Sequence, residues 1–183
     1  AVPLVAVRRA AMLAGGTVPV VATAFADGER SLAEVGLEVL RPVLPMLASS
    51  APDIEAALAK AGPDPVAVET KLDGIRIQVH RRDDEVVIAT RSLDDITARL
   101  PEVVEVARSL PSREFVLDGE ALALDEAGRP RSFQETASRT AQAAGVAVTP
   151  YFFDVLRVDA RDLLDASGSE RHEVLAALVP ERW

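Results

Sequence analysis

Apolar residues recur at helical spacing through the first third of the chain. Residues 3–25 are rich in Ala and Val, and Gly15-Gly16 interrupts them, which predicts two short helices. Ser31, with a glutamate three residues later, has the spacing of a capping box and predicts the start of a third helix. Two prolines make residues 41–48 an extended linker, and a helical pattern over residues 51–61 ends at a Gly-Pro pair.

From residue 66 onward the apolar positions alternate with polar ones, which is typical of strands. Strands are predicted at residues 66–68, 75–79, 86–89, 115–118, 121–124 and 150–158, the first two joined near Asp73-Gly74. Helices are predicted at residues 97–110 (restarting at Pro101), 133–143 and 168–178. Since the strands follow one another as hairpins, we expect an α+β fold with mixed, mainly antiparallel sheets and helices.

The composition is that of a globular protein and excludes several kinds of site. With 183 residues, 49% of them hydrophobic, the chain can form one domain, or one domain with part of another. The absence of Cys excludes disulfides and thiolate metal sites, and two histidines, His80 and His172, argue against a zinc site. No apolar run is long enough for a membrane helix, and Arg8 and Arg9 follow the first apolar stretch, the wrong order for a secretory signal. We therefore expect a soluble, cytoplasmic protein.

The charge balance gives a mixed indication about nucleic acid. A net charge of −9 argues against a nucleic-acid partner, because phosphate binding depends on cations. Five arginines nevertheless fall in one short stretch, and a local basic face can coexist with an acidic body: Arg76, Arg81, Arg82, Arg91 and Arg99. For Arg81 and Arg82 a solvated, charged hairpin is the simpler interpretation.

Lys71 stands out because it is one of only two lysines in a chain with 18 arginines. Where a plain positive charge is enough, this chain uses arginine, so a lysine in an apolar, strand-like run indicates a need for an amine. A lysine amine can become a nucleophile, whereas a guanidinium does not lose its proton. Residues 71–76 read K-L-D-G-I-R, the K-x-D-G-x-R spacing of enzymes that couple a nucleotide to lysine.

Four segments in order resemble the motifs of the covalent nucleotidyltransferases, which include DNA ligases, RNA ligases and mRNA capping enzymes. They are residues 71–76 (motif I), 90–92 (T-R-S, motif Ia), 117–120 (L-D-G-E, motif III) and 151–156 (Y-F-F-D-V-L, motif IIIa). The sharper resemblance is to ATP-dependent DNA ligases, since residues 41–48 and 152–163 are similar to their sequences. The Ala, Val and Arg bias suggests an actinobacterial source.

The resemblance implies a set of nucleotide-binding residues. Lys71 would attack the α-phosphate of ATP and carry AMP, and Thr70 beside it belongs to the same nucleotide site. Glu69 would accept from the adenine 6-amino group, and Phe153 would stack on adenine. Glu120 would bind the ribose hydroxyls or a metal ion, which the family uses as Mg²⁺. The plainer interpretations remain open here: Glu69 as a solvated residue and Phe153 as part of the core.

The resemblance also implies contacts to nicked double-stranded DNA. Arg76 would contact the AMP ribose or, after adenylation, the nick, and Arg91 would bind a nick phosphate, although either could be a plain exposed arginine. Asp73 would hold the lysine or shape the turn, and Gly74 would meet a backbone requirement of that turn. Asp118 should share a strand face with Glu120, and Asp154 is expected to be structural. No membrane is implied, and a nucleoid-associated location would follow.

Two further family motifs, a metal-binding E-G element and a pair of lysines, find no counterpart after residue 153. We therefore expect residues 1–36 to be the end of a helical DNA-binding domain and residues 37–183 the first portion of an adenylation domain. The C-terminal OB-fold domain is expected to be missing too, and these 183 residues alone are expected to be nearly inactive. An RNA ligase, a capping-type enzyme or a non-catalytic nucleic-acid-binding module are the alternatives.

Overall fold

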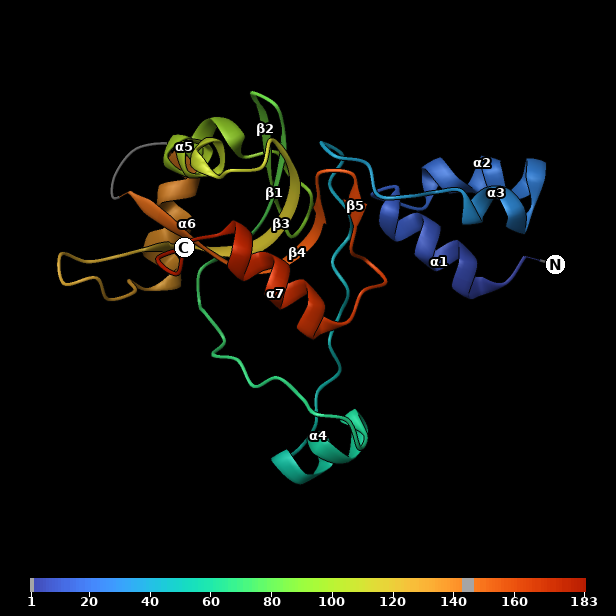
Figure 1. Ribbon diagram of the computed structural model, residues 1–183, viewed down its shortest axis with the longest axis horizontal. Coiled ribbons are helices and arrows are strands. Elements are labelled where there is room, and N and C mark those ends of the chain that lie inside the picture. The colour runs from blue at the N-terminus through green and yellow to red at the C-terminus, as the bar shows by residue number, and fades with distance from the viewer. Residues whose placement is uncertain (1, 143–146) are drawn as a thin grey trace.

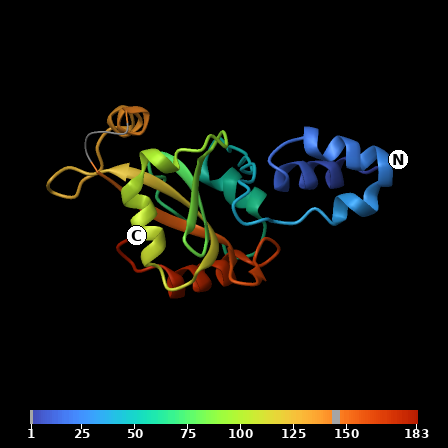
Figure 2. The same ribbon diagram turned by 90° about the horizontal axis from the view of Figure 1, so that it is seen from above.

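The computed structural model describes residues 2–142 and 147–183, which form a helical module followed by a sheet with flanking helices (Figure 1). The module comprises α1 (Leu4–Leu13), α2 (Val18–Asp27) and α3 (Glu29–Ala33) and lies to one side of the sheet (Figure 2). The two predicted helices are confirmed. The predicted cap at Ser31 is wrong, because this residue lies inside α3 and its hydroxyl donates to the Gly28 carbonyl at 3.1 Å.

The sheet has five strands in the order β2-β1-β3-β4-β5, and all their described pairings are antiparallel. The strands are β1 (Ile75–Arg82), β2 (Glu85–Thr90), β3 (Glu114–Ala123), β4 (Val148–Val158) and β5 (Arg161–Asp162). The predicted α+β class is confirmed. β3 is one continuous strand where the sequence predicted two, because Gly119 and Glu120 continue the ladder with β1.

One face of the sheet carries the main core. It packs against α5 (Pro101–Ser109), which follows the short 3₁₀ helix η1 (Thr97–Arg99), and against α7 (Gly168–Leu178). Alternate residues of the central strands enter this core, as the two-residue period of a strand requires: Ile77, Val79, Phe115, Leu117 and Ala121. The predicted restart at Pro101 and the ends of α7 are confirmed. α6 (Phe133–Gln142) confirms the predicted helix, except for Ala143, which lies outside the described residues.

The other face of the sheet holds the linker that leads from the helical module. Leu13 of α1 packs with Val39 and Val43 of the linker against Val116 of β3. The residues at 41–48 have no regular secondary structure, which confirms the predicted extended segment. This packing joins the helical module to the back of the sheet.

Two buried polar side chains of β1 fix the linker. His80 Nδ1 accepts from the backbone N–H of Leu40 at 3.1 Å, so its proton lies on Nε2 and is donated to Gln78 Oε1 at 2.8 Å. Gln78 Oε1 also accepts from the N–H of Val43 at 2.8 Å. His80 is 0% exposed, so its neutral form is the one that satisfies every partner. A second proton on His80 would face the Leu40 N–H and break that contact.

The free energy of unfolding is expected to fall as the pH drops from about 6.5 to about 4, since burial lowers the pKa of His80 to about 4. The unfolded chain takes up this proton at the ordinary histidine pKa, so acid favours unfolding across the window, and the stabilisation is complete above it. A shift of this size corresponds to about 3 kcal/mol. Urea unfolding measured at several pH values checks it.

Two single substitutions serve as the comparison for this pH dependence. In H80N the amide oxygen can still accept from Leu40 but cannot titrate, so the loss of stability between pH 6.5 and 4 should be smaller. H172N changes the exposed histidine and should leave that loss as it is. An H80N protein with the same pH dependence as the unsubstituted chain would contradict the role of His80.

The segment between the linker and β1 contacts little of the sheet. α4 (Ile54–Ala61), capped by the Asp53 side chain on the Ala56 N–H at 2.8 Å, stands apart from the sheet (Figure 1). The predicted strand at 66–68 is wrong: residues 62–73 form no regular element, and Val68 is 93% exposed. An alternating pattern gives a strand only where a neighbouring strand supplies hydrogen bonds, and no described strand lies beside this segment.

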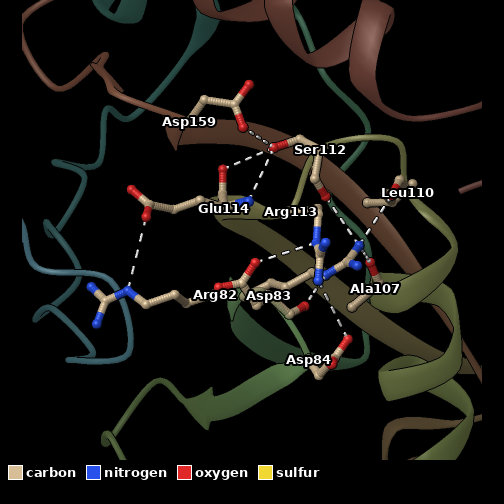
Figure 3. Close-up of polar contacts among 10 residues, drawn as sticks. Arg82, Asp83, Asp84, Ala107, Leu110, Ser112, Arg113, Glu114 and Asp159 are labelled. Atoms are coloured by element: carbon tan, nitrogen blue, oxygen red, sulfur yellow. Dashed lines mark hydrogen bonds and ion pairs between the residues drawn. The ribbon is translucent and has the colours of Figure 1, made fainter.

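The interpretation of residues 81 and 82 as a solvated hairpin is wrong for Arg81, which is buried. It is only 6% exposed, and its Nη1 donates to three carbonyl oxygens of α5 and the loop after it, those of Ala107, Leu110 and Ser112, at 2.9, 3.0 and 3.0 Å. Figure 3 shows this corner of the molecule. Carbonyls at a helix C-terminus lack helical partners and favour a cation. Arg82 is exposed as predicted. Because Arg81 is buried, these two arginines do not form one basic face.

Candidate active site

A cleft of about 790 Å³ opens beside the beginning of β1 and is bordered by α7. Its walls come from the segment before β1, the turn after β2, and from β3, β4 and α7. All seven residues assigned to the site from the sequence line it: Glu69, Thr70, Lys71, Arg76, Arg91, Glu120 and Phe153. The fold thus brings the four motif segments together in one place.

The remaining lining residues had no site role assigned from the sequence: Ala48, Leu72, Phe152, His172 and Leu175. His172 and Leu175 are three residues apart on α7, so they lie on the same side of that helix. The spacing could have marked them as a pair. It could not have shown that α7 packs on β4 beside the cleft, because that contact is tertiary.

Lys71 lies in the irregular segment and not on the strand that the sequence suggested. Its side chain is 86% exposed, and its Nζ donates to the Leu72 carbonyl at 3.2 Å. Asp73 Oδ1 is 3.8 Å from Nζ, which makes it an exposed ion-pair partner of the kind that contributes little to stability. The amine is therefore open to a reactant in the cleft.

Arg76 is held on two sides. Asp118 accepts from its Nε at 3.0 Å and from its Nη2 at 2.6 Å, and the guanidinium carbon lies 5.7 Å from the centre of the Phe153 ring. The hydrogen bond with Asp118 raises the pKa of Arg76 above its already high value. A bidentate pair of this kind fixes the plane of the guanidinium.

Glu120 lies next to Arg76 across the β1–β3 ladder, which agrees with the expectation that it shares a face with Asp118. Its Oε1 accepts from the backbone N–H of Gly74 at 3.0 Å. Burial raises the pKa of Glu120, while the Gly74 hydrogen bond and the charges of Lys71 and Arg76 act in the opposite direction. The half-buried carboxylate can therefore accept hydroxyl groups or contribute one ligand to a metal ion.

Arg91 extends into the cleft from a tight turn. The turn is held by its polar neighbours: the Asp94 N–H donates to Thr90 Oγ1 at 3.2 Å, and Thr90 Oγ1 lies 3.0 Å from Ser92 Oγ. Arg91 itself is exposed. In the T-R-S motif the hydroxyls of Thr90 and Ser92 thus shape the turn, and the turn places the Arg91 guanidinium in the cleft.

A β-bulge sets the position of Phe153. Asp118 pairs with Asp154 and Gly119 with Phe152, so Phe153 is an extra residue on β4 with no partner on β3. Bulges of this kind redirect side chains and are frequent beside functional sites. Both rings line the cleft, but Phe152 is buried in the core, whereas Phe153 is 38% exposed. An exposed ring of this type is available for stacking.

Position 74 requires glycine because of a close contact, and not because of the turn conformation that the sequence predicted. A Cβ added to Gly74 would lie 2.3 Å from the Ala121 carbonyl oxygen and 2.4 Å from the Leu122 side chain, and its φ is not in the left-handed region. Only glycine lets the chain approach β3 this closely. The approach brings the Gly74 N–H to Glu120 and so ties the Lys71 segment to the sheet.

Asp154 has the structural contacts expected of it. It accepts from Arg171 Nε of α7 at 2.7 Å, and Arg171 does not line the cleft. This ion pair fastens the first turn of α7 to β4.

Comparisons with known proteins identify the family of this chain. The ATP dependent DNA ligase domain family matches residues 45–183. A probable DNA ligase of Nocardioides sp. (strain ATCC BAA-499 / JS614) is 73% identical over 179 residues, which are 98% of this chain and 35% of the relative. Another, of Kineococcus radiotolerans, is 64% identical over 97% of this chain and 35% of its own length.

Among solved structures, the ligase domain of M. tuberculosis LigD superposes with a TM-score of 0.50 at 29% identity, over 62% of this chain and 39% of that one. This chain spans about a third of the length of the curated relatives it matches. With a family match over most of its residues and relatives above 60% identity, the chain belongs to the ATP-dependent DNA ligase family.

Proposed function

We propose that this chain is the part of an ATP-dependent DNA ligase that forms the lysyl-AMP intermediate. The observation that supports this most directly is the convergence of Lys71 and the six other residues assigned to the site on one cleft. Residues 37–183 would form the first portion of the adenylation domain, and residues 1–36 the end of a helical DNA-binding domain.

In the first step Lys71 Nζ would attack the α-phosphate of ATP. A P–N bond forms, the bond between the α- and β-phosphates breaks, and pyrophosphate leaves with the electron pair. Phe153 would stack on the adenine, and Glu69 would accept a hydrogen bond from its 6-amino group. Thr70 would lie beside the bound nucleotide. These groups would hold ATP so that the α-phosphate lies next to the amine.

In the later steps AMP would pass from Lys71 to the 5′-phosphate of a nick in double-stranded DNA. The 3′-hydroxyl then attacks that phosphate, a phosphodiester forms, and AMP leaves. Arg91 suits a nick phosphate, because it is exposed on a fixed turn at the edge of the cleft. With a net charge of −9, such binding has to be local, since the chain as a whole repels DNA.

Mg²⁺ would neutralise phosphate charge and stabilise the leaving pyrophosphate when bound. Glu120 would hold this ion, because its carboxylate supplies the hard oxygen ligands that Mg²⁺ prefers. Its Oε1 accepts from the Gly74 N–H, so Glu120 would contribute its other oxygen. Within the described ranges no three His, Asp or Glu side chains gather in a metal-binding group. The donor set therefore fits an ion held largely by phosphate and water.

No described helix is long and apolar enough to cross a bilayer.

The test is covalent labelling of the protein by radiolabelled ATP with Mg²⁺. A ligase chain of the length of the relatives, carrying these residues, should become labelled and then seal nicked duplex DNA. A protein that takes label from GTP alone, or seals only RNA, belongs with capping enzymes or RNA ligases. Failure of the long chain to take any label would favour a non-catalytic nucleic-acid-binding module.

These 183 residues by themselves are expected to take up label at least about a hundredfold more slowly than the long chain. The physical reason is that the Lys71 side chain is 86% exposed, so the described residues do not hold the amine in line with the α-phosphate. Parallel labelling of both proteins at equal concentration measures the difference. Equal rates would show that this portion alone forms the whole adenylation site.

A further inference from the structure

Arg76 has one edge committed and one edge available. Asp118 takes the Nε hydrogen and one Nη2 hydrogen, which together form one side of the planar guanidinium. Three hydrogens remain, two on Nη1 and one on Nη2, and one hydrogen from each of these nitrogens forms a second fork. The structure records no further hydrogen bond for Arg76 among the described residues, and Arg76 lines the cleft. A fork of this shape binds phosphoryl oxygens bidentately.

The orientation of this fork depends on Asp118. The carboxylate is 8% exposed on the central strand β3, so it neither moves freely nor exchanges its partner for water. Phe153 lies against the guanidinium and restricts rotation about the last side-chain bonds. The plane and the direction of the fork are therefore both determined before any ligand arrives.

Two carboxylates of like charge lie directly opposite each other on β3 and β4. Asp118 faces Asp154 on β4, and two carboxylates in that position repel each other unless each has its own cation. Arg76 neutralises Asp118, and Arg171 neutralises Asp154. Only the first arginine lines the cleft. The pair of Asp118 thus connects β3 to the cleft through Arg76, whereas the pair of Asp154 connects β4 to α7 through Arg171.

We propose that Asp118 is a positioning residue that aims the open Nη1–Nη2 edge of Arg76 at a phosphoryl group in the cleft. The inference rests on the proposed function, which supplies two sources of that group, ATP and the 5′-phosphate of a nick. Asparagine at position 118 keeps the shape but replaces one accepting oxygen by an NH₂ donor, so the bidentate contact is lost. Glutamate keeps the charge but moves it by one methylene.

The experiment compares D118N, D118E and D154N in the full-length ligase chain. Two reactions are measured separately: formation of the AMP adduct from labelled ATP, and sealing of a nick that already carries AMP on its 5′-phosphate. D118N is expected to slow at least one of them by about tenfold or more. A loss confined to adduct formation assigns the phosphoryl group to ATP, and a loss confined to sealing assigns it to the nick.

D154N is the control, because it removes the same kind of charge from the same pair of strands. It should lower the unfolding temperature to a similar extent and leave both rates within about twofold of the unsubstituted enzyme. Equal slowing by D118N and D154N would overturn the proposal, since a general structural role would then explain both. Full activity of a folded D118N would overturn it as well.

D118E decides the outcome if D118N does not fold. A purely charge-neutralising Asp118 predicts near-normal rates for D118E, whereas a positioning Asp118 predicts a loss of about tenfold, because the fork is displaced. Near-normal rates of D118E therefore overturn the proposal. The proposed function fails in a different way, namely if the unsubstituted full-length chain forms no adduct with ATP.

Discussion

Replacing Lys71 by alanine in the full-length ligase chain is expected to reduce the covalent AMP adduct to less than about a thousandth of its normal yield. The adduct requires an amine, and Lys71 Nζ is the amine that lines the cleft. Arginine at this position should not restore the adduct, because the guanidinium keeps its proton and offers no lone pair for attack. Labelling with ATP and identification of the modified peptide by mass spectrometry measure both variants.

Within these 183 residues a single second lysine serves as the control for this experiment. The only other lysine in the 183 residues, Lys60, lies on α4, where its Nζ donates to the Ser50 carbonyl at 2.9 Å. K60A should form the adduct at the normal rate. An adduct that persists in K71A, or that maps to Lys60, would remove Lys71 from the mechanism and with it the proposed function.

The seven residues that meet in the cleft could be selected from the sequence, because the selection depends on residue type and on the order of motifs. A lysine kept among 18 arginines, followed in order by T-R-S, D-G-E and F-D elements, requires no knowledge of distances. The longer helices could also be predicted from the sequence, because capping residues and apolar spacing are local signals. α7, for example, begins after Ser167, whose hydroxyl accepts from the Glu170 N–H at 3.2 Å, as an N-cap residue does.

What the sequence could not provide was the set of partners. Val66 and Val68 have the alternation of a strand, yet they form none, because a strand also needs a neighbour. Arg81 resembles its exposed neighbour in sequence and differs from it because the carbonyls at the end of α5 surround its guanidinium. The pairing of Arg76 with Asp118 spans 42 residues, so only the folded sheet reveals it. Each of these outcomes depends on a tertiary contact, absent in the first case and present in the other two, that the local sequence pattern does not contain.

Replacing Gly119 by alanine is expected to reduce the free energy of unfolding by about 3 kcal/mol. A Cβ at this position would lie 2.6 Å from the Tyr151 carbonyl oxygen and 2.9 Å from the Phe152 ring. The ring can turn aside, but the carbonyl belongs to the backbone of β4, so β4 itself has to move away from β3. Urea unfolding of the two proteins measures the change.

The same substitution should also slow formation of the AMP adduct by about a hundredfold, because small displacements of a binding site have large effects on rate. Gly119 lies at the bulge that places Phe153 and next to Glu120, so any separation of β4 from β3 moves both sides of the cleft. G168A is the matched control: it lies at the start of α7, and apart from its chain neighbours and its own helix no atom lies within 4 Å of the added carbon. Alanine suits a helix better than glycine, so G168A should match or slightly exceed normal stability and label at the normal rate. If G119A behaves like G168A, close contact between β3 and β4 is not what requires glycine in the D-G-E element.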